Sequence, residues 1–267
     1  MAIFNNVKGK DLEVLKGFKE QAWNNPVVRF LDGSGRDLIP RKGGLYSAGS
    51  LLERMVLALE KAGRDVPAWL GLAAFEMNPR EKETACFAMY CYWTGEKLLG
   101  RIEGVLATRI GMHGRYEVVE VDFDPTVVSF DKLLKEGRKL KCAGRVFART
   151  DRQLDLARLL VGDAAIRSDM QVDTKTRQQK HLSTRPDYDF LPLTPLQATK
   201  INGAIAFKES PDRLLSPTQL SLKEEITAVL RDDPKFLAEL KPDRSPEGLT
   251  EYFHALKKRL GEAESDF

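Results

Sequence analysis

Cys91, Tyr92 and Trp93 are neighbours in the stretch TACFAMYCYWTGEKLLG, and together they could support thiol chemistry. The apolar and aromatic residues before Cys91 predict a buried strand over residues 84–92, and those after it predict a helix over 95–102. A cysteine at such a junction lies beside the free N–H groups of the helix, whose partial positive charge favours a thiolate. The two rings would form an apolar wall for a small group such as a methyl. The alternative is that Cys91 is a small buried hydrophobe.

The segments after this cysteine must fold around it to hold it in place. Along the chain they alternate between strand-like and helix-like patterns. Apolar runs predict further strands, and helical spacing predicts helices between them. The strands are expected over residues 105–111, 117–123, 145–148 and 164–166, and the helices over 129–138, 151–160 and 176–183. This order predicts an α/β fold with a mixed sheet.

The N-terminal residues predict a smaller helix–hairpin–helix arrangement. A helix is expected over residues 11–24, a hairpin with arms 27–31 and 37–39 around an Asp-Gly-Ser-Gly turn, and a second helix from Ser47 to Gly63. Residues 65–80 predict a linker-like helix or turn. The arrangement resembles the C-terminal half of a thioredoxin-like domain, but no cysteine precedes Cys86, so the CxxC motif of such a domain is missing.

The sequence from residue 191 onward predicts helices only. Thr194-Pro195 and Ser216-Pro217 have the pattern of helix N-termini, and a last helix is expected to end near Leu260. We therefore predict three parts: a thioredoxin-like fragment over 1–78, an α/β domain over 79–190 and a helical extension over 191–267.

Composition narrows the classes of function. The chain has 267 residues, and its net charge of +3 comes from 42 basic and 39 acidic residues that are well mixed, which argues against nucleic-acid binding. No apolar run is long enough for a membrane span, and the N-terminus lacks the pattern of a secretory signal. Three widely spaced cysteines fit a reducing cytoplasm. The three histidines are too scattered to predict a metal site.

The stretch around Cys91 resembles the A-type peptide methionine sulfoxide reductases, whose hallmark is Gly-Cys-Phe-Trp-Gly followed by a Glu. Tyr90-Cys91-Tyr92-Trp93 takes the hallmark position, with Glu96 at the Glu. The segment from Gly114 to Val121 matches Gly-His-Ala-Glu-Val-Val-Glu-Val, and Phe123-Asp124-Pro125 matches Phe-Asp-Pro. Arg-Gln-Gln-Lys-His-Leu over residues 177–182 resembles His-Gln-Gln-Tyr-Leu. The resemblance covers about residues 84–190 and implies a reductase-like mixed-sheet core.

The resemblance implies a role for each matching residue. Cys91 would attack the sulfur of methionine (S)-sulfoxide, free or in a peptide, and become a sulfenic acid. Tyr92 and Trp93 would hold the substrate methyl group. Glu117 would donate a proton to the sulfoxide oxygen, since a carboxyl in an apolar pocket can stay protonated near neutrality. The alternative for Glu117 is a solvent-exposed carboxylate at a strand end.

Two departures from the family pattern affect the expected pocket. The family has a long loop between the positions of Gly111 and Glu117, and here only five residues remain, so one pocket tyrosine is missing. Tyr116 lies next to Glu117 and is a substrate-binding candidate, although it is not equivalent to that tyrosine. The family's Asp-x-Gly-Thr-Gln-Tyr-Arg-Ser has no counterpart either. Losing donors around a developing oxyanion costs about 10²–10³ in rate for each donor.

Cys142 is the candidate for a second redox cysteine. It lies about where the family's second pocket tyrosine would be, and Lys139, Lys141 and Arg145 surround it, which would favour a thiolate. A Cys91–Cys142 bridge would need Cα atoms within about 7 Å. Cys86 is five residues before Cys91 on an extended strand, roughly 16 Å away, and is expected in the core on the other face.

Three functions remain open from the sequence. The first is thiol-dependent reduction of methionine sulfoxide, with no bound cofactor and with thioredoxin or another dithiol as the external reductant. The second is a different thiol oxidoreductase that uses Cys91 and Cys142 as a redox pair. The third is an inactive relative that kept the fold and binds a partner.

Overall fold

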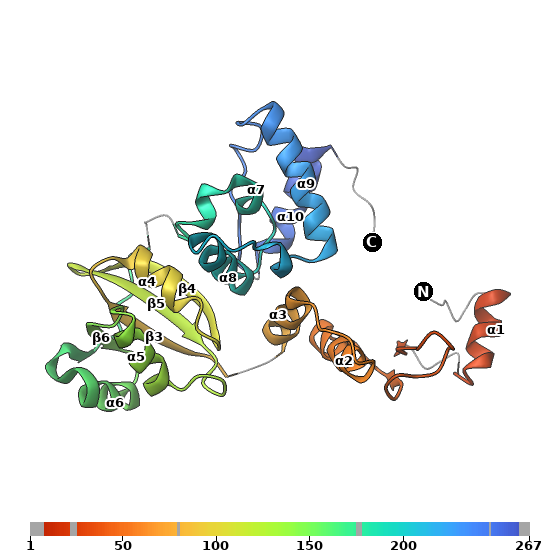
Figure 1. The fold of residues 1–267 in the computed structure, drawn as a ribbon, viewed down its shortest axis with the longest axis horizontal. Helices are drawn as coiled ribbons and strands as arrows, with labels where there is room; N and C mark the ends of the chain where they lie inside the picture. Colours follow the sequence, from red (N-terminus) through yellow and green to blue (C-terminus); the bar gives the residue numbers. More distant parts are fainter. Residues whose placement is uncertain (1–7, 22–25, 79–80, 175–177, 246, 262–267) are drawn as a thin grey trace. The chain divides into compact units, whose positions relative to one another are not determined.

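The computed structural model describes residues 8–21, 26–78, 81–174, 178–245 and 247–261, which form two compact units (Figure 1). The first unit comprises residues 1–78 and the second residues 79–267. The predicted helical extension therefore belongs to the same unit as the sheet. No helix among the described residues is both long enough and apolar enough to cross a membrane.

The first unit consists of helices around a small hairpin. Its elements are α1 (Lys10–Gly17), β1 (Val27–Val28), β2 (Lys42–Gly43), α2 (Ala48–Lys61) and α3 (Ala68–Met77). The chain reverses at the predicted turn, where Leu31 and Asp37 form an isolated bridge, but the predicted second arm over 37–39 is wrong: the strand that pairs with β1 is Lys42–Gly43, and this ladder is only two residues long. Ser47 caps α2 as predicted, accepting a hydrogen bond from the Ser50 N–H. The likeness to a thioredoxin-like domain stays a prediction.

Helix α1 ends earlier than the sequence predicts. Phe18 forms its C-cap, and Lys19 has a positive φ of 55°, which a helix cannot continue through. The predicted end of this helix, including Ala22 and Trp23, lies outside the described residues.

A five-stranded mixed sheet organises the second unit. Its strands are β3 (Glu83–Ala88), β4 (Val105–His113), β5 (Tyr116–Phe123), β6 (Arg145–Ala148) and β7 (Ala165–Arg167), in the order β4-β5-β3-β6-β7. All neighbouring pairs are antiparallel except β6 and β7, which are parallel. The sheet confirms the predicted α/β class, and β3 is its central strand.

The main apolar core lies on one face of this sheet. Three helices contribute to it: α4 (Tyr92–Leu99), α5 (Phe130–Lys139) and α6 (Asp151–Val161). Because side chains alternate along a strand, Phe87 of β3 and Val119 of β5 point to this face, where they meet buried residues such as Leu99 and Leu133. The opposite face carries a smaller cluster of Cys86, Ala88, Val118 and Phe147.

The C-terminal residues are helical, as predicted. They form α7 (Pro186–Asp189), α8 (Pro195–Ala206), α9 (Pro217–Asp232) and α10 (Leu249–Leu260). Thr194 and Ser216 each form a capping box, with Gln197 and Gln219 respectively. Helix α8 lies against β4, where Thr199 Oγ1 accepts a hydrogen bond from the Thr108 N–H at 3.3 Å.

The helix predicted over residues 176–183 is wrong for the part that is described. Residues 178–181 form a turn, and only a 3-10 helix follows at Leu182–Thr184. Gln179 has a positive φ of 51°, and the N–H groups of Gln179 and Lys180 donate to the side chain of Glu96 rather than to helix carbonyls. A tertiary contact therefore replaces the local helix.

Candidate active site

The N-terminus of α4 lies directly after the central strand and presents Cys91 at its N-cap. Cys91 has an extended backbone, and its side chain is only partly buried and makes no capping hydrogen bond. Its carbonyl accepts the first helical bond, from the Gly95 N–H at 3.1 Å. The thiol is therefore located beside the positive end of a helix, as the sequence predicts.

Close packing of α4 on β5 requires a glycine one turn into the helix. A Cβ at Gly95 would lie 1.9 Å from the Met89 sulfur and 2.9 Å from a Val119 methyl carbon. Gly95 therefore lets the helix approach the sheet closely enough to bring the Cys91 junction against β5.

Glu117 of β5 lies beside Cys91. The Met89 N–H donates to the Glu117 carbonyl at 3.1 Å, which continues the β3–β5 ladder to the end of the strand. The Tyr92 N–H then donates to Glu117 Oε2 at 2.8 Å. The Glu117 carboxyl thus accepts a hydrogen bond from the first N–H of α4, which the Cys91 side chain does not cap.

Tyr92 and Trp93, the first two residues of α4, pack their rings against each other. Their ring centroids are 5.5 Å apart, with the planes tilted at 47°. Trp93 is 38% exposed, so a ligand can reach its ring. The Lys180 Nζ lies 4.7 Å from the centre of the Trp93 ring. The sequence analysis gave Lys180 no role, because the contact depends on how the segment around residue 180 returns to α4.

A buried carboxyl attaches that segment to α4. Glu96 is fully buried, and it accepts hydrogen bonds from the N–H groups of Gln179 at 2.8 Å and Lys180 at 3.0 Å. Asn202 of α8 donates to it at 3.4 Å. Burial raises the pKa of Glu96, while these donors act in the opposite direction. Glu96, named above only for its place in the family pattern, is therefore a structural anchor.

Cys142 lies close to Cys91 but in a different environment. The Gly144 N–H donates to the carbonyl of Ala88 at 3.0 Å, so the loop after α5 adjoins the end of β3. The Cys142 side chain is 1% exposed, and its thiol donates to the Leu140 carbonyl at 3.2 Å. Burial raises the pKa of Cys142, and the charge of a Cys91 thiolate raises it further.

The expected cationic environment of Cys142 is wrong. Lys139 pairs with Glu136 at 2.6 Å, and the Arg145 guanidinium lies 5.0 Å from the centre of the Tyr116 ring, which belongs to the other face of the sheet. The pKa of this thiol is raised, since desolvation prevails. The basic residues are close to Cys142 in the sequence, but this did not predict that their charged groups contact other side chains.

Tyr116 is not brought to Cys91. It precedes Glu117 on β5, so their side chains point to opposite faces of the sheet. Its ring lies 5.8 Å from that of Phe147, within the smaller cluster, and the Arg115 guanidinium donates to its hydroxyl at 3.1 Å. The structure therefore corrects the placement of Tyr116 as a substrate-binding residue, because strand alternation separates it from its neighbour.

Cys86 lies in the smaller cluster on this opposite face, fully buried as predicted. Burial raises its pKa to about 12. None of the three cysteines is in a disulfide. Among the described residues, no group of three or more His, Cys, Asp or Glu side chains could hold a metal ion.

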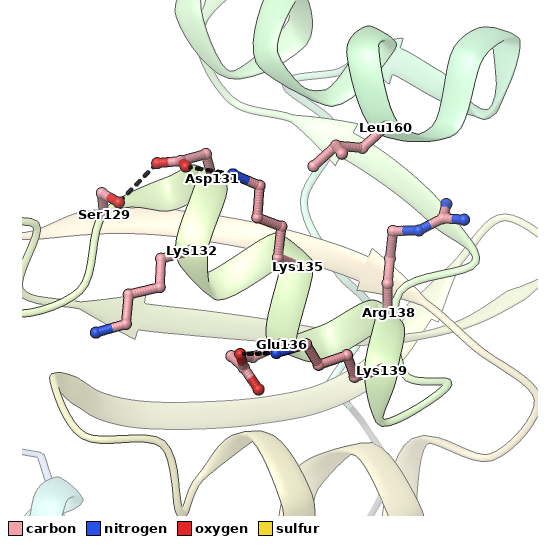
Figure 2. Close-up of a pocket in the computed structure, with 8 residues that line it drawn as sticks. All are labelled: Ser129, Asp131, Lys132, Lys135, Glu136, Arg138, Lys139 and Leu160. Carbon is pink, nitrogen blue, oxygen red and sulfur yellow. Dashed lines mark hydrogen bonds and ion pairs between the residues drawn. The ribbon is translucent and has the colours of Figure 1, made fainter.

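A wide pocket along α5 is separate from this site (Figure 2). Ser129, Leu160 and charged residues of α5, including Lys132 and Arg138, line it. Two of its lysines pair with carboxylates on the same helix, Lys135 with Asp131 at 3.1 Å and Lys139 with Glu136 at 2.6 Å. None of the residues predicted to act in catalysis lines this pocket, which has the character of a solvated helix surface.

Curated proteins similar to this chain are peptide methionine sulfoxide reductases. The protein from Drosophila melanogaster is 42% identical over 66 residues, which cover 20% of this chain and 27% of the relative. The protein from Streptomyces griseus is 36% identical over 98 residues, covering 27% of this chain and 44% of the relative. The chain thus spans less than half the length of these relatives. No family model matches it.

Among solved structures, methionine sulfoxide reductase A of Corynebacterium diphtheriae is similar to part of this chain. The likeness has a TM-score of 0.29 at 23% identity and covers 36% of this chain and 62% of that one.

Proposed function

We propose that this chain, which carries a segment related in sequence to the peptide methionine sulfoxide reductases, reduces methionine sulfoxide at Cys91. The observation that carries the proposal is the 2.8 Å hydrogen bond from the Tyr92 N–H to Glu117 Oε2. It puts a carboxyl next to a partly exposed cysteine at a helix N-terminus, which is the pairing of nucleophile and acid that the reaction needs.

The reaction begins when the Cys91 sulfur attacks the sulfoxide sulfur. A sulfur–sulfur bond forms, Glu117 Oε1 delivers a proton to the sulfoxide oxygen, and the sulfur–oxygen bond of the substrate breaks to release hydroxide. The hydroxide then attacks the Cys91 sulfur, which breaks the sulfur–sulfur bond and releases the thioether. The products are a thioether and a Cys91 sulfenic acid, so the substrate is reduced by two electrons and the cysteine is oxidised by two. The Tyr92 and Trp93 rings provide the apolar surface for the substrate methyl group.

An external thiol completes the cycle. A first thiol condenses with the sulfenic acid, releasing water and forming a disulfide, and a second thiol reduces that disulfide and restores Cys91. A dithiol reductant such as thioredoxin supplies both thiols. In this proposal no bound cofactor takes part.

A second candidate function uses Cys142 as the first of these thiols. The observation that favours it is the 3.0 Å hydrogen bond from the Gly144 N–H to the Ala88 carbonyl, which brings the loop of Cys142 against the end of β3, three residues before Cys91. Cys142 is buried and its thiol donates to Leu140, so the loop after α5 must open before a disulfide forms. This candidate predicts a Cys91–Cys142 disulfide after one turnover.

Turnover of the two epimers of dabsyl-methionine sulfoxide with dithiothreitol tests the proposal. We expect the S epimer to be reduced and Cys91→Ser to lower the rate at least about 10³-fold, because oxygen cannot replace the thiolate. Cys86→Ala, which removes a sulfur on the opposite face, is the matched control and should keep activity. If Cys91→Ser turns over normally, or if the unmodified protein reduces neither epimer, the proposal is wrong and a binding role remains.

Mass spectrometry after a single turnover separates the two candidates. A sulfenic acid trapped on Cys91 by dimedone supports the external thiol. A protein mass lower by two hydrogens, together with a disulfide-linked pair of peptides that contain Cys91 and Cys142, supports the internal pair. In the second case Cys142→Ser should stop turnover with thioredoxin.

A further inference from the structure

The ammonium of Lys180 stands over the aromatic surface beside the candidate nucleophile. Its Nζ is 4.7 Å from the centre of the Trp93 ring, and Trp93 follows Cys91 by two residues. Among the residues that the structure describes, no carboxylate forms an ion pair with Lys180. Its positive charge is therefore held at the site by an aromatic ring, which is a weaker partner than a carboxylate.

The backbone of Lys180 is fixed, although its side chain is long. Glu96 accepts the N–H groups of both Gln179 and Lys180, so two hydrogen bonds attach this turn to α4. The same helix carries Trp93 and begins after Cys91. A ligand that contacts the Trp93 ring therefore meets Lys180, whose side chain can turn from the ring towards that ligand.

A second lysine, Lys97, follows Trp93 by one turn on α4, and its Nζ lies 5.7 Å from the centre of the Phe207 ring. Glu96 is buried and accepts the backbone N–H groups of Gln179 and Lys180, so its carboxyl forms no ion pair with the Lys180 ammonium. A ligand at this surface would gain from a negative charge of its own.

We propose that Lys180 determines specificity by binding a carboxylate of the substrate while the sulfoxide lies against Trp93. This inference rests on the proposed reduction of methionine sulfoxide at Cys91. Two substrates offer the same chemistry: free methionine sulfoxide, through its α-carboxylate, and a peptide with an acidic residue beside the oxidised methionine. In both, Lys180 leaves the ring and makes a charge-assisted hydrogen bond.

Kinetics on matched substrates test the proposal. L-methionine sulfoxide is compared with L-methioninamide sulfoxide, and acetyl-Asp-methionine sulfoxide amide with its Asn counterpart. We expect the protein to favour the carboxylate member of one pair by roughly 10-fold in kcat/KM, mainly through KM. The pair that shows the preference identifies the source of the carboxylate. Lys180→Met keeps the length and the contact with Trp93 but should abolish the preference, whereas Lys180→Arg should retain it.

Lys132→Met is the control, because Lys132 is an exposed lysine on α5, in the separate pocket of Figure 2. It should leave the preference and the activity unchanged. The proposal is overturned if neither pair shows a preference in the unmodified protein, if Lys180→Met keeps it, or if Lys180→Met lowers the rates on charged and neutral substrates equally.

A binding measurement separates this inference from the proposed reaction. Calorimetric titration of the Cys91→Ser protein with L-methionine and L-methioninamide, and with Asp- and Asn-methioninamide peptides, needs no turnover. We expect about 10-fold tighter binding of the carboxylate ligand, which Lys180→Met in the same background removes. If no sulfoxide is reduced but this difference is present, the reductase proposal fails and the carboxylate site stands. If sulfoxide is reduced without such a difference, the inference about Lys180 fails alone.

Discussion

The β3–α4 junction and the loop between α5 and β6 each carry a cysteine, and they give it different surroundings. Cys91 is partly exposed, precedes free helix N–H groups and lies beside Glu117. Cys142 is 1% exposed and donates to a carbonyl, which disfavours its thiolate. The two loops adjoin at the end of β3, so the two cysteines do not differ in which end of the sheet they occupy. What separates the two thiols is exposure and the kind of hydrogen-bonding group that faces each one.

Of the changes compared below, removing the carboxyl proposed as the acid at the first junction should have the largest effect on turnover. Glu117→Gln can still accept the Tyr92 N–H but cannot deliver a proton to an oxyanion. We expect kcat/KM for methionine sulfoxide to fall by about 10²–10³, with little change in stability, because general acids contribute factors of this size. Glu136→Gln, which changes an exposed carboxylate on α5, is the control. A loss below about 3-fold in Glu117→Gln would show that Glu117 is not the acid.

Alkylation should distinguish the two thiols directly. In the folded protein we expect iodoacetamide to modify Cys91 at least about 100-fold faster than Cys142, because Cys142 reacts only when its loop opens. Peptide mass spectrometry of time points measures both rates, and repeating it in 6 M guanidinium should make them similar. Equal rates in the folded protein would show that the loop after α5 is open, and would favour the internal redox pair.

The strands and the cysteine junction could be predicted from the sequence because their patterns are local, although β3 ends at Ala88 rather than at residue 92 and α4 begins at Tyr92 rather than at residue 95. The apolar run before Cys91 and the alternation around Val119 fix strands and their faces, and Ser47, Thr194 and Ser216 mark helix starts. The helix predicted over 176–183 failed because Glu96, more than 80 residues earlier, binds the backbone of Gln179 and Lys180. Local pattern carries no information about such a partner.

The candidate site was predictable to the same extent. Cys91, Glu117, Tyr92 and Trp93 were predicted to act together. The structure joins Tyr92 to Glu117 by a hydrogen bond directly after Cys91 and packs Trp93 against Tyr92, and their joint role in catalysis stays a prediction. Tyr116 was misplaced because adjacency in a strand means opposite faces. The basic residues around Cys142 were misjudged because their partners, Glu136 and Tyr116, are set by the fold. Lys180 was missed because its contact with Trp93 joins two distant segments.

The two helices that flank the cysteines should also respond differently to an added methyl group. Gly95→Ala places Cβ within 2.9 Å of Val119 and closer still to Met89, whereas at Gly137 of α5 the nearest atom, Ala143 Cβ, is 3.2 Å away. We expect Gly95→Ala to lower the free energy of unfolding by about 1–2 kcal/mol and Gly137→Ala to change it by less than about 0.5 kcal/mol. Urea denaturation measures both.

Gly71→Ala is the control for helix propensity, since nothing lies within 4 Å of a Cβ at this position in α3. It should stabilise the protein by about 0.5–1 kcal/mol. If Gly95→Ala is equally stabilising, α4 does not pack on β5 as closely as the structure indicates.

Cys86 extends the comparison to the other face of the sheet and should have the smallest effect. Burial raises its folded-state pKa to about 12 from an ordinary value of 9.0. Because the folded pKa lies above the unfolded one, the neutral thiol contributes stability that is fully present below pH 9 and is lost as the pH rises towards 12. Between pH 8 and 10 the unfolding free energy of the unmodified protein should therefore fall by about 1 kcal/mol more than that of Cys86→Ala. Parallel pH dependences in urea denaturation would mean that the Cys86 thiol ionises as readily in the folded chain as in the unfolded one, and that its face of the sheet is open to water.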